Sequence, residues 1–169
     1  MDGSRPSVKL NQDYFSGFYE HGIDPDGHWV VYRIDSKLYS VPIDGMRSPV
    51  LIQVPPGTFH DVRSFQLAPR ASRVVFRASQ DSPAGVELFS VAIGGDQGSI
   101  QISSSSPSGP VVGDVEFFRA TPDGSRVVYA ADQDVDLLVD LFSVRTDGKG
   151  EPVRLTRSEE RRVGKECRL

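Results

Sequence analysis

The residues of this chain best suited to metal chemistry are three aspartates at alternate positions, Asp132, Asp134 and Asp136. Calcium-binding loops place their oxygen ligands at alternate positions in the same way. Here, however, no glycine follows at the bend and no glutamate closes the loop. The three aspartates are therefore weak candidates for a metal site. The alternative that we favour is a solvated loop between two strands.

The other residues whose side chains could take part in catalysis or binding form no recognisable site. His21, His28 and His60 have no partner at the spacing of metal ligands, and we interpret them as surface histidines. Trp29 suits either a surface anchor for a partner or packing against a loop, and we favour packing. Glycine-flanked serine elbows, phosphate loops and zinc-binding His-Glu motifs do not occur. We therefore expect no catalytic residue, no cofactor and no enzyme activity in this segment.

Three copies of one strand pattern fill most of the chain. Each copy has an apolar strand, then a strand that reads Leu, aromatic, Ser, Val, then a turn with glycine. The paired strands are residues 30–32 and 38–41, residues 74–76 and 88–91, and residues 127–129 and 141–144. The pattern recurs at roughly 50 residues, a period typical of propeller blades rather than of helical solenoids.

Each copy contains four strand candidates. A proline-led turn such as Pro122-Asp123-Gly124 separates the first two, although copy two has Pro69-Arg70-Ala71 and a looser turn is expected there. The second strand is apolar at successive positions, which is typical of a strand covered on both faces. The fourth strand alternates between apolar and polar residues, as expected for an outer strand with one solvent-exposed face. These features predict an all-β fold: an incomplete β-propeller of three four-stranded antiparallel blades in an open ring.

The same pattern predicts the organisation of the chain. We expect blades at residues 12–54, 55–106 and 107–156. Residues 2–10 match residues 147–155, so residues 1–11 are expected to be the outer strand of a preceding blade that this chain lacks. Residues 157–169 leave the pattern and can be back-translated into a common sequencing adapter read in frame. We expect them to be a non-native tail and exclude them from fold reasoning.

The repeat resembles the TolB-like, WD-related (WD40-like) β-propeller repeat over about residues 1–156. The residues that carry the resemblance are 121–129, 140–144 and 147–148. It implies part of a bacterial, non-enzymatic protein-interaction scaffold and favours a periplasmic or secreted location. Two alternatives stay open: the gating propeller of a prolyl-oligopeptidase-like serine peptidase whose catalytic domain is missing, or a propeller that binds a carbohydrate or another small ligand.

The charge balance limits the partners. The chain has 19 Lys and Arg against 23 Asp and Glu, a formal net charge of −4. Nucleic acids and anionic membrane surfaces attract basic patches, so neither is an expected partner, and no membrane insertion is expected. A protein is the expected partner. The single cysteine, Cys167, lies in the tail, so the repeats have neither a disulfide nor a thiolate metal site.

Overall fold

The computed structural model describes residues 7–11, 18–52, 61–70, 72–79, 85–104, 114–134 and 138–156. Within these ranges the chain forms twelve strands and no helix. The predicted all-β class is therefore confirmed. The tail, residues 157–169, lies outside the described residues, and so does Asp136.

The strands form three four-stranded sheets, each a meander of antiparallel neighbours. The first contains β1 (Phe18–Ile23), β2 (Trp29–Ile34), β3 (Lys37–Pro42) and β4 (Val50–Leu51). The second contains β5 (Asp61–Ala68), β6 (Arg73–Ser79), β7 (Glu87–Ala92) and β8 (Ile100–Gln101). The third contains β9 (Val115–Ala120), β10 (Arg126–Ala131), β11 (Asp140–Arg145) and β12 (Val153–Arg154). The predicted three four-stranded antiparallel units are confirmed.

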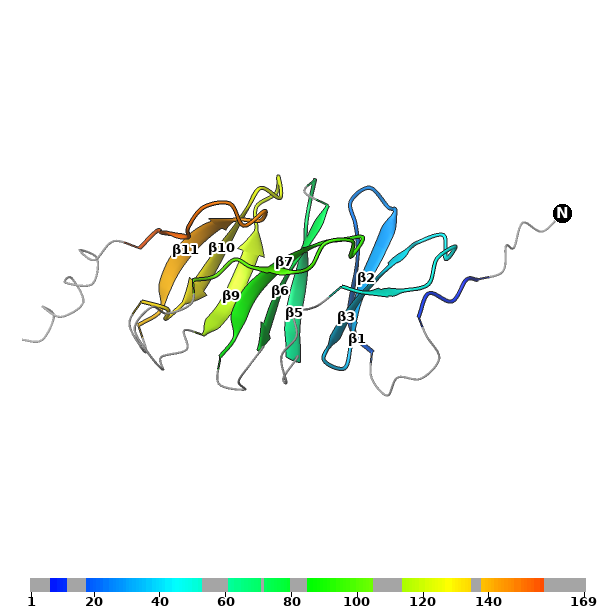
Figure 1. The fold of residues 1–169 in the computed structure, drawn as a ribbon, viewed down its shortest axis with the longest axis horizontal. Helices are drawn as coiled ribbons and strands as arrows, with labels where there is room; N and C mark the ends of the chain where they lie inside the picture. The colour runs from blue at the N-terminus through cyan, green and yellow to red at the C-terminus, as the bar shows by residue number, and fades with distance from the viewer. Residues whose placement is uncertain are drawn as a thin grey trace, which may run out of the picture.

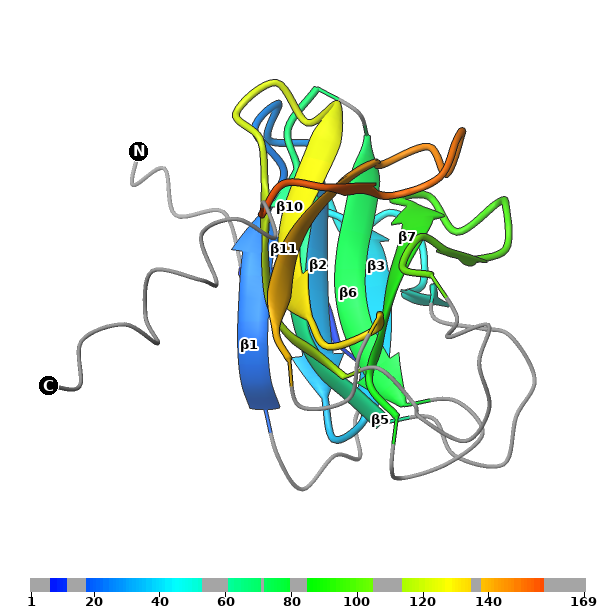
Figure 2. The ribbon, with the colours of Figure 1, turned by 90° about the vertical axis from the view of Figure 1, so that its left-hand side faces the viewer.

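The sheets stand side by side and pack through their faces (Figures 1 and 2). Side chains point alternately to the two faces of a strand. In the second sheet Val74 therefore joins the core shared with the first sheet, and Val75 joins the core shared with the third. Both are fully buried. This explains the run of successive apolar residues, because both faces of the central strands are covered.

The first and third sheets lie at opposite ends of the row and do not meet (Figure 1). The open arrangement is thus confirmed. The free face of the third sheet remains apolar, with Phe117, Val153 and Leu155 each about half exposed, at 57%, 54% and 49%. In the described part of the chain no sheet covers them.

An arginine at the start of the central strand is tied to a serine on the next strand in two sheets. Arg73 Nε donates to Ser90 Oγ at 2.8 Å, and Arg126 Nε donates to Ser143 Oγ at 2.7 Å. In the first sheet Trp29 stands in place of the arginine and packs against the core between the first and second sheets. The packing interpretation of Trp29 is confirmed. One consequence is that Ser40, the matching serine, is buried and its hydroxyl has no hydrogen-bond partner.

Removing the serine hydroxyl should therefore have different effects on stability in the first and third sheets. Ser143→Ala is expected to lower the free energy of unfolding by about 1–3 kcal/mol, because the Arg126 guanidinium loses a partly buried acceptor. Ser40→Ala is expected to be neutral or slightly stabilising, since it removes a buried hydroxyl that bonds nothing. Urea unfolding of the two variants measures the difference. Equal decreases in the free energy of unfolding for the two variants would contradict this account of the arginine–serine pairs.

Candidate functional site

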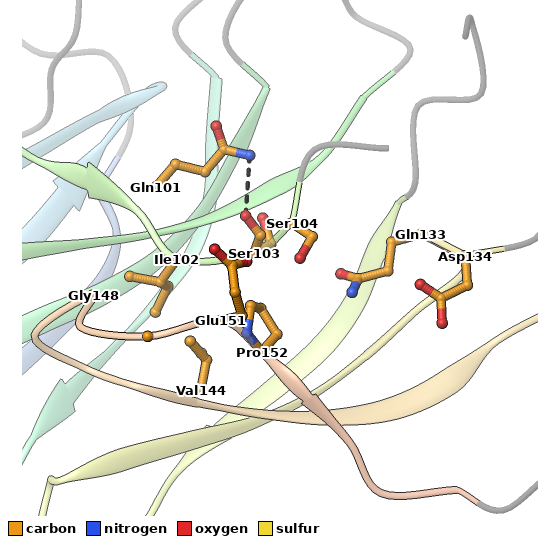
Figure 3. A pocket seen from close by; sticks show the side chains of 11 residues that line it. Gln101, Ile102, Ser103, Ser104, Gln133, Asp134, Val144, Gly148, Glu151 and Pro152 are labelled. Atoms are coloured by element: carbon orange, nitrogen blue, oxygen red, sulfur yellow. Dashed lines mark hydrogen bonds between the residues drawn. The ribbon is translucent and has the colours of Figure 1, made fainter. Parts of the chain in front are cut away.

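A polar hollow of about 550 Å³ opens between the second and third sheets (Figure 3). The residues after β8 form one side. The end of β10 and the turn before β12 form the other. Its lining residues are Gln101, Ile102, Ser103, Ser104, Gln133, Asp134, Val144, Gly148, Gly150, Glu151 and Pro152. Most of the lining side chains can form hydrogen bonds, and none is a histidine or cysteine.

Gln133 is the most buried amide of this hollow. Its side chain is held by Tyr129, whose hydroxyl donates to Gln133 Oε1 at 2.9 Å. Burial raises the pKa of the Tyr129 hydroxyl, so the phenol stays neutral and remains a donor. Gln133 itself is only 4% exposed. The Gln133 oxygen accepts from Tyr129, and the amide nitrogen is the donor that this side chain offers to a molecule in the hollow.

One side of the hollow adjoins a network of ion pairs. Arg154 on β12 lies 2.7 Å from the buried carboxylate of Asp140 and 3.6 Å from the carboxylate of Asp134. The Thr156 hydroxyl also donates to Asp140, at 2.6 Å. This arrangement pairs the carboxylates of Asp134 and Asp140 with Arg154. The hollow can bind a small polar molecule by hydrogen bonds.

The aspartates proposed as calcium ligands do not converge in the described residues. Asp132 Oδ1 accepts a hydrogen bond from the backbone N–H of Asp114 at 2.7 Å, and Asp134 faces Arg154. Asp136 lies outside the described residues. Across the part of the chain that the structure describes, no three His, Cys, Asp or Glu side chains are grouped to hold a metal ion. The metal site therefore stays a prediction.

The histidines are also apart from one another. His21 is exposed on β1, and His28 is exposed in the turn that follows this strand. His60 lies outside the described residues. The two described histidines thus form no common site.

A second candidate surface is the rim of turns at one end of the sheets. In a four-stranded meander the first and third turns lie at the same end. Figure 1 shows the three first turns together at the upper end of the row. We call this surface the turn rim. It comprises residues 24–28, 43–49, 69–72, 93–99, 121–125 and 146–152, except residue 71, which is not described.

Aspartates hold these turns in shape. Asp24 accepts the N–H of Trp29 at 2.6 Å, and Asp44 accepts the N–H of Met46 at 2.9 Å. Such side-chain bonds to nearby backbone are how Asp stabilises turns. The second sheet closes its first turn without glycine, and Arg70 takes a φ of +62° there. That conformation costs a non-glycine residue roughly 1–2 kcal/mol.

The turn rim carries fixed negative charge. The hydrogen bond from the Thr121 hydroxyl is the main cause that lowers the pKa of Asp123 to about 2, and bonds from Ser125 add to it. The pKa of Asp147 is also well below its usual range, chiefly because the Arg145 side chain donates to it. Both carboxylates are therefore ionised at every pH near neutrality.

Polar side chains that connect neighbouring sheets were not predicted from the sequence. Arg33 Nη1 donates to the carbonyl of Val62 at 3.3 Å, and Arg77 Nη1 donates to the carbonyl of Val115 at 3.0 Å. Gln66 bonds the backbone of β9 through both its amide oxygen and its amide nitrogen, at 3.1 and 3.2 Å. Arg33 and Arg77 follow the aromatic residue of their strands directly, so the repeat alignment contained a signal for them.

Alkaline pH is expected to destabilise the protein through its buried tyrosines. Burial raises the pKa of Tyr32 to about 12. The folded state thus holds this proton more tightly than the unfolded chain, whose tyrosine pKa is about 10. The resulting stability is complete below pH ~10 and is lost as the pH rises through ~12. Tyr32→Phe should move the alkaline unfolding midpoint upward, as followed by Trp29 fluorescence, with little change near neutral pH. An unchanged alkaline midpoint would show that Tyr32 does not contribute.

Comparison with known proteins gives a fold but no family. No protein-family model matches the sequence, and no curated protein matches it. Among solved structures, a protein described as TolB from Agrobacterium tumefaciens is 24% identical, with a TM-score of 0.57 over 85% of this chain. The AtxE2 isopeptidase is 10% identical with a TM-score of 0.54 over 86% of this chain. A puromycin hydrolase is 18% identical with a TM-score of 0.51 over 81% of it.

These similarities identify the three sheets as blades of a β-propeller, so the predicted fold is confirmed. The chain spans half the length of the TolB structure, 30% of the isopeptidase and 23% of the hydrolase. In the described residues no helix is both long and apolar enough to cross a bilayer.

Proposed function

We propose that this chain is part of a non-enzymatic propeller scaffold that binds another protein through the turn rim. The observation that carries the proposal is the hydrogen bonding that holds the turns of that rim. Its turns close on short hydrogen bonds to their own aspartates, and the sheets beneath are connected by Arg33, Arg77 and Gln66. Rigid elements keep exposed groups in a fixed geometry, which lowers the entropy lost on binding.

The exposed chemistry of the turn rim suits a polypeptide partner. Met46 is 86% exposed, and methionine adapts well to irregular apolar surfaces. The exposed carboxylates of Asp26, Asp96 and Asp123 surround the turns with negative charge. A partner with basic residues beside an apolar side chain fits both features, since complementary charge speeds and orients association.

The polar hollow supports a second candidate function, the binding of a small polar ligand such as a carbohydrate. It offers the amide nitrogen of Gln133 and the side chain of Asp134 on one side and the side chain of Ser103 on the other, with no aromatic residue among its described lining residues. A propeller that gates a serine peptidase is the remaining alternative, and the similar isopeptidase and hydrolase structures share only the fold. A Gly-x-Ser-x-Gly motif beyond residue 156 in the parent gene would favour the peptidase.

Site-specific cross-linking tests the scaffold proposal. A photoreactive amino acid at Met46 is expected to yield a discrete protein adduct in extracts of the source organism. The same group at Glu116, an exposed position on β9, is the matched control and should yield none. Asp26→Lys and Asp96→Lys should weaken the Met46 adduct by reversing rim charge. Equal labelling from both positions, or an adduct insensitive to rim charge, would contradict binding at the rim.

A further inference from the structure

Aspartate is followed directly by glycine at five positions of this chain, Asp2, Asp26, Asp44, Asp123 and Asp147. Asp2 lies outside the described residues. In the other four pairs the glycine has a φ between +68° and +72°, and its N–H donates to the carbonyl three residues earlier at 2.8–3.1 Å. Glycine has no Cβ to hinder the approach of the aspartate side chain to the backbone nitrogen. Such pairs are therefore the positions where a carboxyl group can react with its own backbone.

The reaction is an isomerisation that needs only water. The glycine nitrogen attacks Cγ of the aspartate, a C–N bond forms, and the carboxyl oxygen leaves as water with the proton of the N–H. Water then reopens the cyclic imide at one of its two carbonyls. Opening at the backbone carbonyl leaves the chain linked through Cγ, as isoaspartate. The carboxyl must be neutral when its oxygen leaves, so hydrogen bonds that favour the ionised carboxylate slow the reaction.

Asp123 in the first turn of the third sheet is protected in this way. Its carboxylate accepts hydrogen bonds from the Thr121 hydroxyl at 2.5 Å and from the Ser125 hydroxyl at 2.8 Å. The backbone N–H of Ser125 also donates to it, at 3.1 Å. The adjoining Gly124 is buried, and an added Cβ there would overlap the carbonyl oxygen of Pro69. The carboxylate is thus held ionised beside a glycine with no room for a ring.

Asp26 occupies the same position in the first sheet without this protection. The positions that carry the two hydroxyl donors in the third sheet are Asp24 and His28 here. Asp24 accepts the N–H of Trp29 at 2.6 Å, and a carboxylate has no proton to donate. Among the described residues none donates a hydrogen bond to the exposed carboxylate of Asp26. Gly27 is exposed, and nothing lies within 4 Å of a Cβ built on it.

The two remaining pairs are also held by donors. Asp44 accepts the backbone N–H of Met46 at 2.9 Å. Asp147 accepts two bonds from the Arg145 guanidinium, at 2.9 and 2.7 Å, and one from the N–H of Lys149 at 3.1 Å. Of the four described pairs, Asp26 is therefore the one whose carboxylate no described donor holds.

We propose that Asp26 is a site of spontaneous covalent modification, at which its side chain closes an imide with the nitrogen of Gly27 and reopens as isoaspartate. Asp44, Asp123 and Asp147 keep their ordinary linkage over the same time. The product has one more methylene in the backbone of the turn and carries its carboxylate on the main chain. The site lies on the turn rim, but the reaction requires no partner and goes beyond the function proposed for that rim.

Ageing of the folded full chain at neutral pH tests the proposal. Peptide mapping by mass spectrometry, with fragmentation that distinguishes the two linkages, measures all four pairs in one sample. Isoaspartate at Asp26 should exceed that at Asp123 by at least about tenfold, because the pKa of Asp123 is lowered to about 2 and each pKa unit changes the neutral fraction tenfold. His28→Ser supplies a donor like Ser125, so it should reduce the yield at Asp26 severalfold.

Two controls make each outcome decisive. A synthetic peptide of residues 22–30 sets the time, and ageing continues until most of it has isomerised. Asp26→Glu keeps the charge but requires a larger ring that closes far more slowly, so the signal at this position should vanish. No isoaspartate at Asp26 by that time would overturn the proposal. So would equal yields at the four pairs, or an unchanged yield in His28→Ser that is folded by circular dichroism.

The outcome can be told apart from that of the rim proposal. The mapping reads the linkage of the chain in a purified sample, whereas cross-linking from Met46 reads a partner in an extract. An unmodified Asp26 would leave a Met46 adduct unexplained by this reaction but still expected. An isoaspartate at Asp26 would equally be found in a chain that binds nothing at its rim.

Discussion

Replacing Gly124 with alanine is expected to lower the free energy of unfolding by roughly 3–5 kcal/mol, a loss at the upper end for single substitutions. Gly124 has a φ of +70° and is buried in the first turn of the third sheet. A Cβ there would overlap the carbonyl oxygen of Pro69 and lie 2.8 Å from its carbonyl carbon. These are backbone atoms of the neighbouring blade and cannot rotate away. The third sheet would have to move off the second.

Gly27→Ala is the matched control for this prediction. Gly27 holds the same position in the first sheet with a φ of +72°, but nothing lies within 4 Å of an added Cβ. The substitution should therefore cost only the backbone strain, about 1–2 kcal/mol. Urea unfolding of both variants isolates the cost of the contact between blades. Similar losses at the two positions would mean that the close approach at Pro69 contributes little.

Leucine truncation should report how well each blade is covered. Leu38, Leu88 and Leu141 occupy the same position in the three copies, at the start of the shared leucine–aromatic–serine–valine motif. Leu88 is fully buried against the third sheet, and Leu38 is fully buried against the second. Truncation to alanine at either is expected to cost about 2–5 kcal/mol. Leu141→Ala should cost less, because its side chain is only partly buried and no further blade covers it in the described part of the chain.

Unfolding followed by circular dichroism compares the three truncations on the same chain. A loss at Leu141 as large as that at Leu88 would show that the free face of the third sheet is covered, and would contradict the open arrangement. A small loss at Leu88 would contradict the packing of the second and third sheets.

Much of this fold could be predicted from sequence because its determinants are local. Valine pairs such as Val74 and Val75 indicate strands covered on both faces, and glycine-containing turns mark where strands reverse. Repetition strengthens the prediction of each strand, since its pattern occurs in three copies of the repeat. The blade boundaries inferred from the repeats stay predictions. The short outer strands were also recognisable, although β12 contains only Val153 and Arg154.

The candidate site is harder to predict from the sequence, because it depends on residues from different blades. The hydrogen bond between Tyr129 and Gln133, which shapes the hollow, joins the end of a strand to a loop of variable length. Nothing in the spacing indicates that Arg154 lies between Asp134 and Asp140. The sequence favours packing of Trp29, but its consequence for Ser40 follows only from the arginine–serine hydrogen bonds that the other two sheets form.

The meander within each sheet also bears on how the chain folds. Every strand pairs only with strands that neighbour it in sequence, so a blade can form before distant parts of the chain meet. Short sequence separation between contacts favours rapid folding. The blades then influence one another only through adjacent faces, as units of a one-dimensional array do. In such an array the middle unit, with two stabilised faces, opens least often, and fraying begins at the ends.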